Sequence, residues 1–232
     1  MSTSVALLGG ADLGAAVGAL MVPFTRRELA ASLSRASAGD DASPVATATQ
    51  APPRVTGRHW VALAVASGLL PAYVLHGVGW SIIALPPLLL LVGLIQLAYC
   101  DLTRRLLPKT LVWALSAAVV VSGVISAGVT HEWHRLAIAS VGGAAFFALF
   151  FVINLVNPRW IAFGDVRLSL VVGFGLAWVS ATALLEGFFV ANLLGAVVGL
   201  VLIATRRAER NYAVPFGLYL ALGTAVVLLA WS

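Results

Sequence analysis

Long runs of apolar residues constrain this chain more than any other feature of its sequence. A helix that crosses a bilayer needs about 20 mainly apolar residues. The runs are continuous and do not alternate with polar residues, which is typical of helical spans and not of membrane strands. They predict an all-α integral membrane protein, a polytopic bundle of about eight transmembrane helices. The predicted spans are roughly 4–24, 60–78, 81–100, 110–129, 136–156, 166–183, 187–205 and 212–231.

The composition supports a membrane protein and argues against a soluble domain. Of the 232 residues, 61% are hydrophobic and 10% are charged, whereas soluble domains are about half apolar and a quarter charged. The single cysteine, Cys100, allows neither an intrachain disulfide nor a cysteine zinc site. We expect no metal or other cofactor, and we attribute the net charge of +5 to membrane topology and not to nucleic-acid binding.

The basic residues predict the orientation in the membrane. If the N-terminus lies outside, the inside segments hold every one of the 14 lysines and arginines except Arg135, as the positive-inside rule requires. Arg104, Arg105 and Lys109 are then topology anchors that can also contact anionic lipid headgroups. We expect one transmembrane domain over residues 1–232. Within it, the small, polar and proline-bearing segment 25–59 forms a flexible cytoplasmic loop.

Two aspartates lie at predicted membrane boundaries. Asp101 ends the third span and Asp165 begins the sixth, and the two are 64 positions apart in the sequence. That interval holds two crossings, and an even number of crossings returns the chain to the same side. Parity therefore predicts that both carboxylates lie at the cytoplasmic boundary, at similar depth.

Paired carboxylates in such a setting have a known chemistry. In a low-dielectric pocket the two do not both ionise, and their titrations split. The ionised partner can take a proton from water while the protonated partner hydrogen-bonds a scissile carbonyl, as in aspartic proteases.

A structural alternative to catalysis is that the aspartates form ion pairs, Asp101 with Arg104 or Arg105, and Asp165 with Arg167. Locally, Gly164 permits a tight bend before Asp165. Pro108 predicts that residues after Asp101 form an irregular turn.

Four stretches of the sequence resemble the type IV prepilin peptidases, which are intramembrane aspartic proteases of the G-x-G-D type. In chain order they are "GAAVGALMVPFTRREL" (14–29), "CDLTRRLLPKTL" (100–111), "AFGDVRL" (162–168) and "VPFGLYLALG" (214–223). The resemblance implies that Asp101 and Asp165 are the catalytic pair. It implies supporting motif roles for Gly164, Arg167, Pro108 and Ala162.

The resemblance also implies a substrate and a location. Family members remove the basic leader of prepilins and pseudopilins, just before the hydrophobic N-terminal helix of the substrate. They act at the cytoplasmic face of the bacterial inner membrane. We therefore expect a multi-pass membrane peptidase whose partners are prepilins or pseudopilins and membrane lipids.

The sequence departs from the family pattern in three features, at two positions and in one segment. Ala162 replaces the first glycine of G-x-G-D, and Leu218 stands where many members have a second proline. The segment 25–59 lacks the paired cysteines with which larger members bind zinc in a region linked to N-methylation. The sequence thus predicts no zinc there and does not predict methyltransferase activity.

Two other functions remain open at this point. A small transporter could use the carboxylates as a proton relay, although transporter sites usually lie near the bilayer midplane. A non-catalytic homologue could act in pilus or secretion assembly, with Ala162 as its support. Gln96 and Asn154, which are polar residues inside predicted spans, are expected to form interhelical hydrogen bonds.

Overall fold

The computed structural model describes residues 81–104, 109–158, 161–205 and 216–231, with isolated positions between 23 and 74. Within these ranges every regular element is a helix. The 3-10 helix η1 leads directly into α3, and five further α-helices follow. Their bounds are η1 Ile82–Ala84, α3 Leu85–Arg104, α4 Lys109–Thr130, α5 Trp133–Val156, α6 Phe163–Val179, α7 Ala181–Ala204 and α8 Phe216–Ala230.

The predicted all-helical membrane class is confirmed for the part of the chain described. Four helical stretches are long and apolar enough to cross a membrane, and α8 contributes a shorter apolar stretch. The four are Ile82–Tyr99, Lys109–Thr130, Trp133–Val156 and Ala181–Val201. The predicted spans 4–24 and 60–78 and the loop 25–59 lie outside the described ranges, so the count of eight helices remains a prediction.

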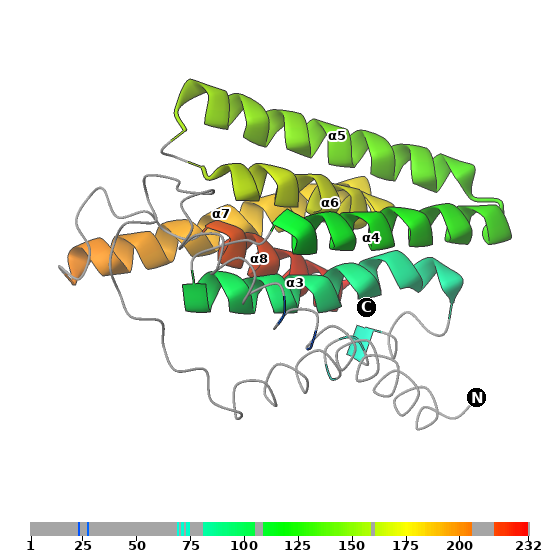
Figure 1. Ribbon diagram of the computed structural model, residues 1–232, viewed down its shortest axis with the longest axis horizontal. Coiled ribbons are helices and arrows are strands. Elements are labelled where there is room, and N and C mark those ends of the chain that lie inside the picture. Colours follow the sequence, from blue (N-terminus) through cyan, green and yellow to red (C-terminus); the bar gives the residue numbers. More distant parts are fainter. Residues whose placement is uncertain are drawn as a thin grey trace.

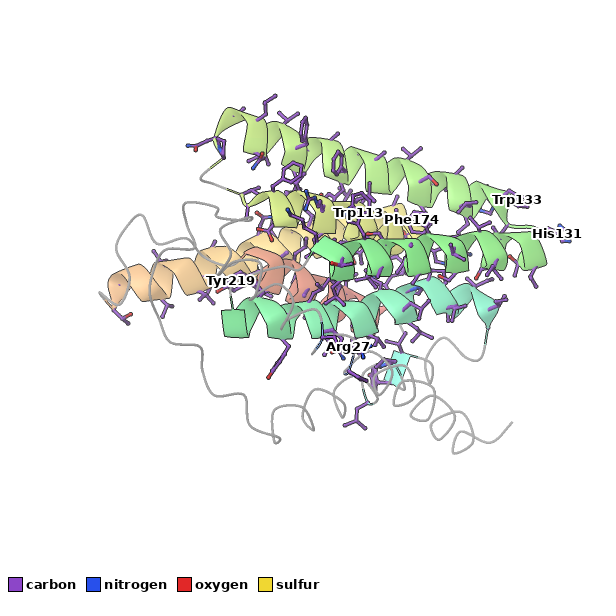
Figure 2. All side chains as sticks on the ribbon, viewed as in Figure 1. Arg27, Trp113, His131, Trp133, Phe174 and Tyr219 are labelled. Carbon is purple, nitrogen blue, oxygen red and sulfur yellow. The ribbon has the colours of Figure 1, made fainter. Side chains whose placement is uncertain are left out.

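The helices run alternately up and down the bundle (Figure 1). Helices α3, α5 and α7 end on the side where α4, α6 and α8 begin. We call this side, which holds Asp101 and Asp165, the aspartate end, and the opposite side the distal end. Figure 2 shows Tyr219 near the start of α8, and His131 and Trp133 at the distal end, where α4 turns into α5. His131 has a φ of 59°, the left-handed conformation that commonly ends a helix.

Helix α6 is the centre of the bundle and contacts α3, α4, α5, α7 and α8. Twelve of its 17 residues are buried, as expected for a helix that is apolar on all sides. Its approach to α5 depends on a glycine. A Cβ atom on Gly173 would lie 2.6 Å from the Cβ of Phe146 and 2.9 Å from the carbonyl oxygen of Gly142. Helix α6 is therefore fixed by protein contacts over most of its surface, Asp165 included.

The distal end is closed by hydrogen bonds from side chains to the backbone of η1. The Ser126 hydroxyl donates to the carbonyl oxygen of Ile82 at 2.7 Å, and the Trp178 indole N–H donates to that of Ile83 at 2.9 Å. Buried carbonyl groups need such partners. These two bonds attach the start of α3 to α4 and α6.

Two predicted boundaries were wrong. Residues 101–104 continue α3 instead of forming an irregular turn, because neither glycine nor proline occurs between Asp101 and Pro108. The connection predicted at residues 184–186 is instead Ser180 alone, so Glu186 lies inside α7. The Ser180 hydroxyl accepts a hydrogen bond from the N–H of Thr182 at 3.1 Å. A serine that caps a helix in this way starts α7 early.

Candidate active site

Asp101 lies in the last turn of α3 and is buried, with 6% of its surface exposed. Its Oδ2 accepts a hydrogen bond from the backbone N–H of Leu218 at 3.2 Å. Leu218 belongs to the first turn of α8, 117 positions further along the chain. The end of α3 is thus joined to the beginning of α8 through this carboxylate.

Asp165 lies in the first turn of α6 and is also 6% exposed. Its carboxylate accepts hydrogen bonds from the backbone N–H groups of Ala162 and Gly217, and it lies close enough to Asp101 for the two charges to interact. The N–H of Asp165 donates in return to the carbonyl oxygen of Ala162 at 2.9 Å. In a capping box, an acidic side chain in the first turn accepts a hydrogen bond from the N–H of the N-cap residue. Asp165 makes this contact with Ala162, the N-cap of α6.

The first turn of α8 contacts both carboxylates through consecutive backbone groups. The N–H of Gly217 bonds Asp165 and the N–H of Leu218 bonds Asp101. N–H groups in the first turn have no partner inside their own helix, and the helix dipole makes this end positive. The start of α8 therefore presents consecutive N–H groups to both buried carboxyl groups.

The segment before α6 is fixed by a side chain of α5. Asn154, in the last turn of α5, donates from Nδ2 to the carbonyl oxygen of Ile161 at 2.7 Å. The predicted interhelical bond of Asn154 was therefore wrong in its partner, which lies in the connection and not in another helix. Gln96 is 1% exposed in α3 and lies beside Leu111 and Leu115 of α4.

Arg167, two positions after Asp165, contacts an aromatic ring. The guanidinium carbon of Arg167 lies 4.7 Å from the ring centroid of Phe163, a cation–π contact. Among the described residues no ion pair joins Arg167 to Asp165, so the structural alternative is wrong for this aspartate. Lys109 is exposed at the start of α4, also at the aspartate end.

The remaining predicted residues fall into two groups. Ala162 is the N-cap of α6, with a φ of −69°, and Gly164 follows in the first turn. Arg104 ends α3, without a described side chain, whereas Arg105 and Pro108 lie outside the described ranges.

Among the residues that the structure describes, no three histidine, cysteine or acidic side chains lie together as metal ligands would.

Sequence reasoning missed the backbone donors. It singled out carboxylates, but the groups that hold them are N–H groups of Gly217, Leu218 and Ala162. The sequence carried one signal for these donors: the stretch 214–223 and both aspartates lie in motifs that resemble the same family. No local pattern indicates which N–H faces which carboxylate.

Comparison with known proteins identifies relatives that match the region containing both aspartates. The type IV leader peptidase family matches residues 88–203, which include Asp101 and Asp165. The chain is 31% identical over 170 residues to a prepilin leader peptidase/N-methyltransferase of Stutzerimonas stutzeri, covering 71% of this chain and 56% of that protein. It is 28% identical over 183 residues to the protein of the same name from Pseudomonas aeruginosa, covering 75% and 59%.

A relative of the same name from Legionella pneumophila is 27% identical over 168 residues, covering 71% of this chain and 56% of the relative. The chain thus spans little more than half the length of the curated relatives it matches. No solved structure matches the chain.

Proposed function

Since this chain belongs to the type IV leader peptidase family, we propose that it is a prepilin leader peptidase. It is an aspartic endopeptidase that removes the leader of type IV pilin-like precursors at the cytoplasmic face of the bacterial inner membrane. The observation that carries the proposal is the buried pair of Asp101 and Asp165, held together by the first turn of α8. The names of the relatives supply the substrate class.

The pair supports peptide hydrolysis by water. One carboxylate, ionised, takes a proton from a water molecule, and the water oxygen attacks the carbon of the scissile carbonyl. The other carboxyl, protonated, donates a hydrogen bond to the carbonyl oxygen and stabilises the tetrahedral intermediate. As the C–N bond breaks, a proton passes to the departing amine. The products are a leader that ends in a carboxylate and a pilin with a free N-terminal amine, and no cofactor takes part.

The pair's surroundings suit this chemistry. Burial strengthens the field of each charge, and the N–H groups of Gly217 and Leu218 fix the carboxylates before substrate arrives. Prearranged groups of this kind lower the cost of reorganisation during reaction. The location at one end of the bundle suits a substrate that is cut where its helix leaves the membrane. It disfavours a transporter, whose site would lie near the midplane.

The proposal extends to parts of the molecule beyond the described ranges. The whole chain forms one transmembrane domain of about eight helices, with its N-terminus outside and segment 25–59 as a cytoplasmic loop. The excess of basic residues on the side of the aspartates supports this orientation. The relatives are also named for N-methyltransferase activity. We do not extend that activity to this chain, because 25–59 lacks the cysteines that the resemblance associates with it.

The test is co-expression with a prepilin. Asp101→Asn and Asp165→Asn should each reduce leader cleavage by about a thousandfold or more, since each removes a group that moves a proton. Cleavage is followed by the gel shift of the precursor, and membrane accumulation of each variant is checked by immunoblot. Glu186→Gln, which removes a carboxylate from the distal end, serves as the matched control. Full processing by both aspartate variants would exclude the proposed function.

A further inference from the structure

Asn154 bonds a peptide group that also touches Asp165. The carbonyl oxygen of Ile161 accepts the hydrogen bond from Asn154 Nδ2 at 2.7 Å. The N–H on the other side of the same peptide bond belongs to Ala162, and it donates to the Asp165 carboxylate. A peptide group is planar and rigid, and in the trans form its C=O and N–H point in opposite directions. Fixing the carbonyl therefore fixes the direction of the N–H.

We propose that Asn154 is a positioning residue for Asp165: its side-chain amide holds the Ile161–Ala162 peptide group so that the Ala162 N–H points at the Asp165 carboxylate. This inference rests on the proposed function, in which Asp165 takes part in catalysis. Asn154 touches no reacting atom and acts through the peptide group alone. It links the geometry of the active site to α5, which packs along α6.

The chemistry of the contact requires an amide. A backbone carbonyl oxygen only accepts hydrogen bonds, so the group facing it has to be a donor, and Nδ2 of asparagine is one. An aliphatic residue of similar size leaves the carbonyl without this partner. The two hydrogen bonds also polarise each other through the shared peptide group, because bonds in a chain strengthen one another. Loss of the first should therefore weaken and misdirect the second.

Asn192 provides a matched control. It lies in α7, and its Nδ2 donates to the carbonyl oxygen of Phe188 at 2.8 Å, within its own helix. Asn192→Leu thus removes the same side-chain amide and a hydrogen bond of similar length. It leaves the Ile161–Ala162 peptide group untouched. General effects of placing leucine for asparagine in this membrane bundle should appear equally in both variants.

The experiment measures cleavage kinetics of the purified full chain in lipid nanodiscs with a prepilin. Asn154→Leu should lower kcat by about tenfold or more with KM changed less than about twofold, because misplacement of a reacting group affects the chemical step. Asn154→Gln retains a donor and should recover part of kcat. Asn192→Leu should match the wild type. Wild-type kcat in Asn154→Leu, a loss confined to KM, or no recovery in Asn154→Gln would each overturn the proposal.

A second measurement does not depend on cleavage. Hydrogen exchange of the peptide containing the Ala162 amide should be faster in Asn154→Leu than in the wild type and unchanged in Asn192→Leu. Equal exchange in Asn154→Leu and the wild type would also overturn the proposal. If the wild type cleaves no prepilin, the proposed function fails, whereas the exchange data still decide whether Asn154 holds this peptide group.

Discussion

The backbone N–H of Leu218 lies 3.2 Å from Oδ2 of Asp101, so the first turn of α8 is bonded to the last turn of α3. The neighbouring N–H, that of Gly217, bonds Asp165 of α6. One helix start thus meets both carboxylates with adjacent groups. Any change that moves α8 relative to α3 and α6 should therefore change the positions of both carboxylates together.

The proximity of Asp101 and Asp165 can be tested by cross-linking. In a Cys100→Ala background, Asp101→Cys combined with Asp165→Cys should be joined efficiently by a short bis-methanethiosulfonate reagent. The linked peptides are identified by mass spectrometry. The control combines Asp101→Cys with Ser180→Cys at the other end of α6, about 22 Å further along the helix axis. Equal linking in both pairs would contradict the arrangement.

Ala162 should not limit activity. Its φ of −69° is accessible to any residue, and the group used by Asp165 is its backbone N–H, which glycine also has. We expect Ala162→Gly to keep the cleavage rate within about twofold, because the donor and the extended N-cap conformation are both retained. A rate increase of an order of magnitude, measured with the same prepilin, would show that alanine restrains the site.

Arg167 should contribute modestly to stability. Its guanidinium packs on the Phe163 ring and forms no ion pair with Asp165 among the described residues. Arg167→Gln should lower the free energy of unfolding by about 0.5–1 kcal/mol, the range for an exposed cation–π contact. Denaturant titration in detergent measures this. A loss of about 3–5 kcal/mol, typical of breaking a buried ion pair, would instead indicate that Arg167 neutralises Asp165.

The contact between α7 and α8 should depend on Gly223. A Cβ atom there would lie 2.7 Å from the backbone nitrogen of Ala191 and 2.8 Å from the carbonyl oxygen of Gly187. Gly223→Ala must therefore push α8 away from α7 and should destabilise the protein by about 1–3 kcal/mol. Gly199→Ala is the matched control, because a Cβ there meets nothing within 4 Å. Similar melting temperatures for the two variants would refute the tight contact.

The helical membrane class and the two aspartates could be predicted from the sequence because both depend on local features. Apolar runs of span length identify helices, and parity places Asp101 and Asp165 at the same end. The errors arose where local features are weak. Ser180 alone connects α6 to α7, and a single serine amid apolar residues gives little warning of a turn. Helix α3 continued past Asp101 because only Pro108 is a strong breaker in that stretch.

The sequence by itself determined the all-helical membrane class, the identity of the buried acids and, through motif resemblance, the family. Each follows from residues that are neighbours along the chain, whose apolar or polar character reflects their own surroundings. Only the tertiary structure decided that Gly217 and Leu218 hold the two carboxylates, and that Asn154 bonds the peptide group before α6. Those contacts depend on how separate helices pack, because backbone donors are chemically alike at nearly every residue, and packing alone selects which of them face the acids.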